Sequence, residues 1–104
     1  MMLDSFSLAG KVALVTGASR GLGASIALGF AEAGADVGLV ARSGLETTAE
    51  AVGNVGRQAV KISADLSQPK NAVPQIMEKM MEEFGRIDIL VNAAGIIRRP
   101  PLHS

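Results

Sequence analysis

The sequence predicts an α/β fold, in which a parallel four-stranded sheet of order 3-2-1-4 carries its helices on both faces. Short apolar runs alternate along the chain with segments of helical periodicity, which is typical of parallel strands joined by crossover helices. Right-handed crossovers then bring the first and fourth strands side by side. The reversal of strand order between them marks the edge of the sheet at which ligands bind.

The first strand is predicted at residues 11–15, because its Val-Ala-Leu-Val run lacks the polar alternation of a half-exposed strand. A helix follows over 23–33 and is expected to end at Gly34. Gly29 lies inside this helix, where it is expected to allow close contact with the sheet. The apolar run at 36–41 is the second strand.

A weaker helix at 46–55 leads to a third strand at 58–63, whose partial alternation indicates a sheet edge. A longer helix is predicted over 71–84, with Asn71 as its cap and Pro74 in its first turn. Its apolar residues keep helical spacing and are predicted to lie in the core, namely Ile76, Met77, Met80, Met81 and Phe84.

The fourth strand is predicted at 87–91, and the sheet is expected to be truncated after it. The outer edge of this strand would then be open and apolar, with Ile87, Ile89 and Val91 exposed. Open apolar edges recruit partners, so we predict a homo-oligomer that forms through the exposed edge of the fourth strand.

Three glycines spaced Gly-x-x-x-Gly-x-Gly join the first strand to the following helix. Gly17 permits a turn with positive φ, Gly21 lets a ligand approach the backbone, and Gly23 allows close contact between helix and strand. The free N–H groups of the helix end attract phosphate. The pattern predicts a partial dinucleotide-binding, Rossmann-type domain over 1–95, followed by a disordered tail at 96–104.

Composition excludes several other classes of protein. Lys and Arg together number 10, as do Asp and Glu, so the chain has no basic surface for nucleic acid. The chain has no cysteine and one histidine, which argues against disulfides, a metal site or a cysteine nucleophile. No apolar run approaches the ~18 residues of a membrane span, and the first residues lack a basic leader. We therefore expect a cytoplasmic protein without a membrane partner.

The residues that follow the second strand indicate which nucleotide binds. Ala41-Arg42-Ser43 stands where NAD-binding domains place a carboxylate for the ribose hydroxyls. A guanidinium can instead hold a 2′-phosphate by charge-assisted hydrogen bonds, and Arg20 in the glycine turn adds a second cation. Considered alone, Arg42 would be interpreted as a solvent-exposed charge at the end of a strand. The pair of arginines favours NADP over NAD as the cofactor.

Three motifs together resemble the short-chain dehydrogenase/reductase family over nearly the whole chain. They are the turn from Thr16 to Gly23, the pair Asp65-Leu66, and Asn92-Ala93-Ala94-Gly95. Ala93 replaces the second asparagine of the family's Asn-Asn-Ala-Gly motif. The continuation Gly95-Ile96-Ile97-Arg98-Arg99 is similar to the gluconate and deoxygluconate dehydrogenase branch of the family.

The resemblance implies which residues of this chain contact the cofactor. The pyrophosphate and its ribose would be held by Gly17, Ser19, Arg20, Gly21, Leu22 and Gly23. The 2′-phosphate would be held by Arg42 and Ser43, the adenine by Asp65 and Leu66, and the nicotinamide ribose by Asn92, Ala93 and Gly95.

The resemblance also implies an oxidoreductase that transfers a hydride to or from a carbonyl or hydroxyl substrate, such as a sugar acid. The family uses a tyrosine as general acid/base, and this chain has no tyrosine. Our hypothesis is that the chain is the NADP-binding, amino-terminal half of such an enzyme, has no catalytic residue of its own and is inactive alone. The alternative is a non-catalytic nucleotide-binding or self-associating module. A Tyr-x-x-x-Lys sequence downstream would favour the enzyme.

Overall fold

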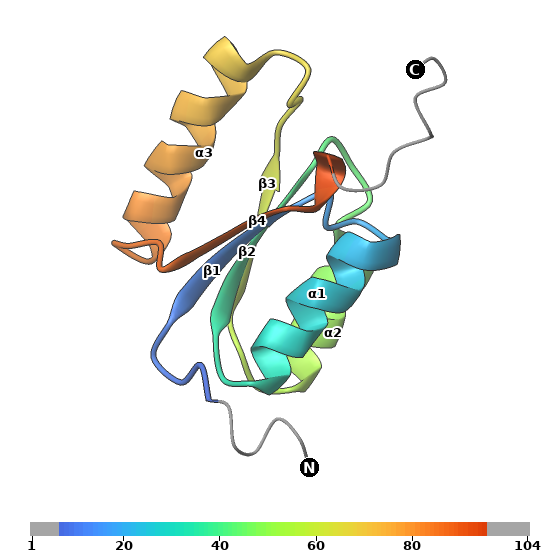
Figure 1. Ribbon diagram of the computed structural model, residues 1–104, viewed down its shortest axis with the longest axis vertical. Coiled ribbons are helices and arrows are strands. Elements are labelled where there is room, and N and C mark those ends of the chain that lie inside the picture. The colour runs from blue at the N-terminus through green and yellow to red at the C-terminus, as the bar shows by residue number, and fades with distance from the viewer. Residues whose placement is uncertain (1–6, 96–104) are drawn as a thin grey trace.

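Figure 1 shows the computed structural model of the protein, which describes residues 7–95. One parallel sheet has the order β3-β2-β1-β4, which confirms the predicted topology. The predicted tail at 96–104 lies outside the described residues. The elements, in chain order, are β1 (Val12–Thr16), α1 (Gly21–Glu32), β2 (Asp36–Ala41), α2 (Glu46–Asn54), β3 (Ala59–Ser63), α3 (Pro69–Glu83), β4 (Ile89–Asn92) and the 3-10 helix η2 (Ala93–Gly95).

The helices lie on both faces of the sheet, as right-handed crossovers require (Figure 1). Helices α1 and α2 cover one face, where Val15, Val37 and Leu39 of the sheet are buried. Helix α3 lies on the other face, over Leu14 and Val40. Both faces of β1 and β2 are buried, which explains their apolar sequences without alternation. None of the helices in residues 7–95 has the length and hydrophobicity needed to span a membrane.

Gly38 in the middle of β2 lets α3 lie close to the sheet, a role that the sequence analysis did not identify. A Cβ atom at this position would collide with the sulfur of Met80, which is fully buried. Gly29, which was expected to serve close contact, has nothing within 4 Å of the place where its Cβ would lie. The prediction for Gly29 is therefore wrong, and the close approach of helix and sheet occurs at Gly38 instead.

Helix α3 begins at Pro69, two residues earlier than the predicted start. Pro69 occupies the start of the first turn, where the N–H that proline lacks would have no partner. Asn71 is consequently not the cap, since Gln68 precedes the first turn and makes no side-chain capping bond. Pro74 lies inside the helix rather than in its first turn, and the carbonyl of Lys70 loses its usual donor there.

The ends of the other predicted elements shift by one or two residues. Strand β1 runs over Val12–Thr16 and α1 begins at Gly21, so the turn between them is shorter than predicted. Strand β4 begins at Ile89 and includes Asn92. The alternation predicted for an edge strand is present in β3, where only every second side chain is buried.

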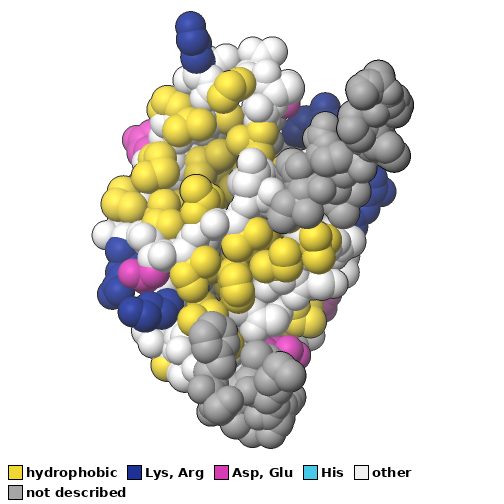
Figure 2. Space-filling view, in the orientation of Figure 1, with side chains coloured by type: hydrophobic (Ala, Val, Ile, Leu, Met, Phe, Trp, Pro, Cys, Tyr) yellow, Lys and Arg dark blue, Asp and Glu magenta, His cyan; other side chains and the backbone are white. Residues whose placement is uncertain are grey.

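The apolar stripe of α3 is only partly in the core. Ile76 and Met80 are buried, whereas Met77 and Met81 are 42% and 43% exposed. At the fourth strand, Ile87, Ile89 and Val91 were expected to be exposed, and this is wrong because all three side chains are half-buried. The exposed side chain there is that of Leu90, at 66%. Figure 2 shows hydrophobic side chains gathered over α3 and the sheet beside it.

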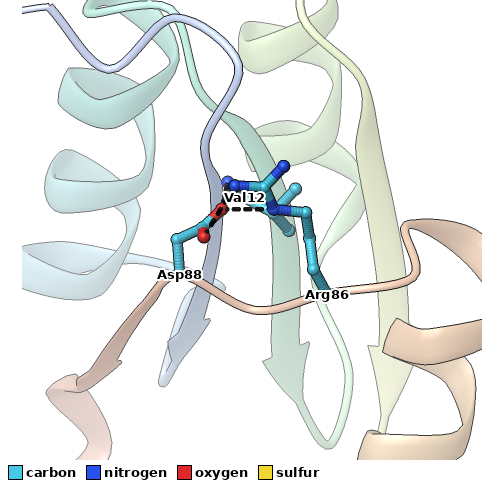
Figure 3. Close-up of polar contacts among 3 residues, drawn as sticks. All are labelled: Val12, Arg86 and Asp88. Carbon is cyan, nitrogen blue, oxygen red and sulfur yellow. Dashed lines mark hydrogen bonds and ion pairs between the residues drawn. The ribbon is translucent and has the colours of Figure 1, made fainter.

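Asp88 fastens the amino end of β1 to the segment that enters β4 (Figure 3). Its Oδ2 accepts a hydrogen bond from the Val12 N–H at 2.8 Å, and the N–H of Asp88 donates to the Val12 carbonyl at 2.8 Å. Arg86 donates to both carboxylate oxygens, at 2.9 Å each. The side-chain and backbone hydrogen bonds from Arg86 and Val12 lower the pKa of Asp88 below its ordinary value of 3.8.

We expect an Asp88→Asn variant to be less stable than the wild-type protein at neutral pH. Because the pKa of Asp88 is lowered on folding, its stabilising effect is present above pH 3.8 and is lost as the pH falls through the lower folded-state value. The difference in unfolding free energy between the two proteins should thus shrink below pH 3.8. Urea denaturation over a pH series measures it, and a difference that does not change with pH would contradict this role.

Candidate functional site

A cavity of about 880 Å³ lies at the carboxyl ends of β1, β2 and β3, beside the amino end of α1. This is the edge at which open parallel sheets bind ligands. The turns after all three strands contribute to its wall. The lining residues are Gly17, Ser19, Arg20, Gly21, Leu22, Gly23, Ala41, Arg42, Ser43, Gly44, Ala64, Asp65, Leu66, Ser67, Ala93 and Ala94.

Of the predicted site residues that the structure describes in full, residues 17–94, all but Asn92 line this one cavity. The prediction for Gly95 is not tested by the described residues. Asn92 lines a neighbouring groove, and Ala94 borders both spaces. The Oδ1 atom of Asn92 accepts a hydrogen bond from the Thr16 hydroxyl at 2.7 Å. Since Thr16 and Asn92 are partners in the register of β1 and β4, this bond fixes the two strand ends at the switch point.

The three glycines have different structural tasks in the turn. Gly17 has a φ of 64°, and a Cβ on it would lie 2.7 Å from the Ala94 nitrogen. A Cβ on Gly23 would collide with the carbonyl oxygen of Gly17, so Gly23 brings α1 against the turn rather than against the strand. Gly21 has a φ of 61° and open space around its Cβ position, which leaves room for a ligand.

The amino end of α1 lacks the usual partners of a helix start. Arg20 occupies the cap position in an extended conformation, and no side chain makes a capping hydrogen bond. The first turn holds no acidic residue. Ala24 is the first residue to donate within the helix, to the Arg20 carbonyl at 3.3 Å. The preceding N–H groups, which face the cavity end of the helix, therefore suit an anion.

Arg42 follows β2 and is exposed at the cavity wall. The Ser63 hydroxyl donates to the Arg42 carbonyl at 2.8 Å, which ties the end of β2 to β3. Nearby, Asp65 accepts hydrogen bonds from the Ser67 hydroxyl at 2.7 Å and the Ser67 N–H at 2.9 Å. These bonds, with a smaller effect of Arg42, lower the pKa of Asp65 below its ordinary value of 3.8, and its carboxylate is ionised at neutral pH.

Thr48 contacts the glycine turn from α2, and its role was not predicted from the sequence. This residue of α2 is buried, and its hydroxyl donates to the Ala18 carbonyl at 2.8 Å. The same oxygen lies 3.4 Å from the Ser19 carbonyl oxygen. A threonine in the first turn of a helix is ordinary in sequence, so only the folded arrangement shows the contact.

An apolar groove of about 490 Å³ runs between α3 and β4, on the sheet face opposite α1. Its walls come from β1, α3, β4 and the loop before α3, and include Leu14, Leu66, Val73, Met77 and Leu90. Strand β4 pairs with β1 alone within the described residues, so its other edge carries unpaired backbone groups. Leu90 of β4 lines the groove, so the groove lies beside this edge.

The sheet order and its helices define a Rossmann-type protein of the α/β class. The chain belongs to the short chain dehydrogenase family, whose sequence model matches residues 11–104. Its relatives in this family include dehydrogenases and reductases.

Relatives include sugar-acid and sugar-converting enzymes. The chain is 48% identical over 99 residues to 2-dehydro-3-deoxy-D-gluconate 5-dehydrogenase of Dickeya dadantii (strain 3937), with 95% of this chain and 39% of that protein covered. The structure of L-sorbose reductase from Gluconobacter frateurii with NADPH and L-sorbose matches with a TM-score of 0.80 and 35% identity, over 94% of this chain and 38% of that one.

Carveol dehydrogenase from Mycobacterium avium, solved with NAD, matches with a TM-score of 0.77 and 32% identity, over 92% of this chain and 40% of that one. Both nicotinamide cofactors therefore occur among similar structures. The chain spans about 39% of the length of the curated relative from Dickeya dadantii.

Proposed function

We propose that this chain is the NADP-binding part of a short-chain dehydrogenase that acts on a sugar acid or a related hydroxy compound. The observation that carries the proposal is the uncapped amino end of α1, which opens onto the same cavity as Arg20 and Arg42. A cavity of about 880 Å³ is in the range of cofactor sites. The assignment of a sugar acid as substrate is based on the 48% identity to the deoxygluconate dehydrogenase.

The roles of the residues follow from their chemistry. The first-turn N–H groups of α1 would hold the pyrophosphate, because Gly21 leaves the backbone accessible. Arg42 would hold the 2′-phosphate with Ser43, and Arg20 would add positive charge. The ionised Asp65 would accept a hydrogen bond from the adenine amino group beside Leu66. Residues after β4, namely Asn92, Ala93 and Gly95, would line the nicotinamide ribose.

When bound, the nicotinamide would supply or accept the hydride. The residues of this chain would bind and orient the cofactor, and Thr16 would hold Asn92 through the 2.7 Å hydrogen bond. The 104 residues contain no tyrosine, which the resemblance implies as the family's proton donor. We therefore expect the chain by itself to bind the cofactor and to reduce no carbonyl compound.

Titration of the purified chain with NADPH and with NADH, followed by calorimetry and nicotinamide fluorescence, tests the proposal. We expect both nucleotides to bind, and NADPH to bind at least about tenfold more tightly because of the two arginines. Equal affinities would contradict the assignment of the 2′-phosphate site. The absence of binding by either nucleotide would contradict the proposed function as a whole.

A second candidate function is self-association through β4, and the exposure of Leu90 favours it. Two copies could pair their β4 edges about a twofold axis, since within residues 7–95 no strand pairs with the outer edge of β4 and its donors and acceptors are free to do so. Strand β4 is Ile-Leu-Val-Asn and carries none of the charged residues that protect natural edges. The pairing would also cover Leu90, which is 66% exposed, and part of the groove formed with Val73 and Met77.

We expect Leu90→Lys to shift the protein from dimer to monomer, because a charge on the edge blocks strand pairing and is costly to bury. Light scattering over a concentration series measures the change. Val55→Lys is the matched control, because Val55 is an exposed apolar residue, at 41%, that follows α2 on the opposite face of the sheet. A wild-type protein that stays monomeric at all concentrations would contradict this candidate function.

A further inference from the structure

We propose that Thr48 is a positioning residue for the cofactor's pyrophosphate. It would orient backbone N–H groups that bind the pyrophosphate, without contacting the ligand itself. Its hydroxyl donates to the Ala18 carbonyl and lies 3.4 Å from the Ser19 carbonyl oxygen, an arrangement that turns the N–H groups of Ser19 and Arg20 toward the cavity. This inference rests on the proposed function and adds a determinant of affinity that lies in α2, outside the cavity wall.

The first step of the argument concerns the carbonyl groups of the turn. Thr48 is 4% exposed and donates its single hydroxyl proton to the Ala18 carbonyl at 2.8 Å. The Ser19 carbonyl oxygen lies 3.4 Å from the same hydroxyl. Both carbonyl groups are therefore directed toward α2. The Ala18 N–H is also fixed, because it donates to the Val40 carbonyl at 3.1 Å.

The second step follows from the planarity of the peptide group. In a trans peptide the carbonyl of one residue and the N–H of the next point in opposite directions, and residues 7–95 contain no cis peptide bond. With the Ala18 and Ser19 carbonyls turned toward α2, the N–H groups of Ser19 and Arg20 point away from α2. Both residues line the cavity, so these donors extend the anion-binding end of α1.

The third step concerns what happens without the hydroxyl. The Ala18 carbonyl would then be buried without a donor, since Ala18 is fully buried. Such a group tends to rotate toward water or another donor. Rotation of that peptide unit would carry the Ser19 N–H out of the cavity. The loss should therefore fall on the pyrophosphate and leave the separate site at Arg42 unchanged.

The test compares Thr48→Val, which keeps the shape and removes the donor, with Thr48→Ser, which keeps the donor. Thr47→Val is the matched control, because Thr47 precedes Thr48 in α2 and is exposed. Each protein is titrated with NADPH and with adenosine 2′-monophosphate, which lacks the pyrophosphate. Circular dichroism measures the folded fraction of each variant at the temperature of the titration.

We expect Thr48→Val to weaken NADPH binding about tenfold, as one orienting hydrogen bond is lost, and to leave adenosine 2′-monophosphate binding unchanged. Thr48→Ser and Thr47→Val should bind both ligands as the wild type does. Unchanged NADPH binding by folded Thr48→Val, or an equal loss for both ligands, would overturn the role of Thr48 alone. A wild-type protein that binds neither ligand would overturn the proposed function and this inference with it.

Discussion

Replacing Gly23 by alanine should abolish tight binding of the dinucleotide and destabilise the fold. The added Cβ would collide with the carbonyl oxygen of Gly17 and lie 3.2 Å from the Cα of Ala18. Both are backbone atoms, so the turn itself must move, and overpacking of this kind costs about 1–3 kcal/mol. Because the turn carries the anion-binding N–H groups, we expect the dissociation constant for NADPH to rise at least about tenfold.

Gly29→Ala is the matched control in the same helix. Nothing lies within 4 Å of its Cβ position, and its φ is not positive, so alanine fits without strain. This variant should be more stable than the wild type by about 1 kcal/mol, because alanine favours helix over glycine. It should bind NADPH unchanged. Urea denaturation and calorimetry on both variants measure the two effects, and unaltered NADPH binding by Gly23→Ala would contradict the close contact of α1 with the turn.

The succession of strands and helices along the chain was predictable from local sequence patterns. Each buried strand has an apolar run, and each helix ends near a glycine. Gly34 and Gly85, for example, adopt the positive φ that ends α1 and α3. The start of α3 was less predictable, since Pro69 and Pro74 both suit a first turn by sequence. The sequence alone does not distinguish the two prolines, and in the structure the helix begins at Pro69.

The cavity was predictable to a large extent because its residues belong to short motifs that follow strands. The topology then brings these strand ends together, and among residues 17–94 the predicted site residues line one cavity, with Asn92 as the exception. Thr48 could not be predicted, because its contact with Ala18 joins residues 30 positions apart. The exposure of Leu90 could not be predicted from the sequence either. The alternation of side chains along β4 does not show which face of the strand is left without a covering helix.

Arg42→Ala should change which nucleotide binds and leave the fold intact. Arg42 is exposed and lies at the cavity wall, where its guanidinium can meet a 2′-phosphate. A hydrogen bond to a charged group is worth about 1.5–3 kcal/mol, which corresponds to a loss of about 10- to 100-fold in NADPH affinity. NADH lacks the 2′-phosphate, so its affinity should change little. The preference of the wild type should also decrease as salt is added, because exposed charges are screened.

Lys61→Ala provides the control for net charge, since Lys61 is an exposed cation of β3 that does not line the cavity. If long-range attraction by the whole protein set the preference, both variants would lose NADPH affinity to a similar extent. If direct contact sets it, only Arg42→Ala will lose affinity. An Arg42→Lys variant separates charge from geometry, because lysine keeps the positive charge but cannot form the two-pronged hydrogen bond of a guanidinium. Partial recovery of the NADPH preference in that variant would assign the remainder to this hydrogen-bond geometry.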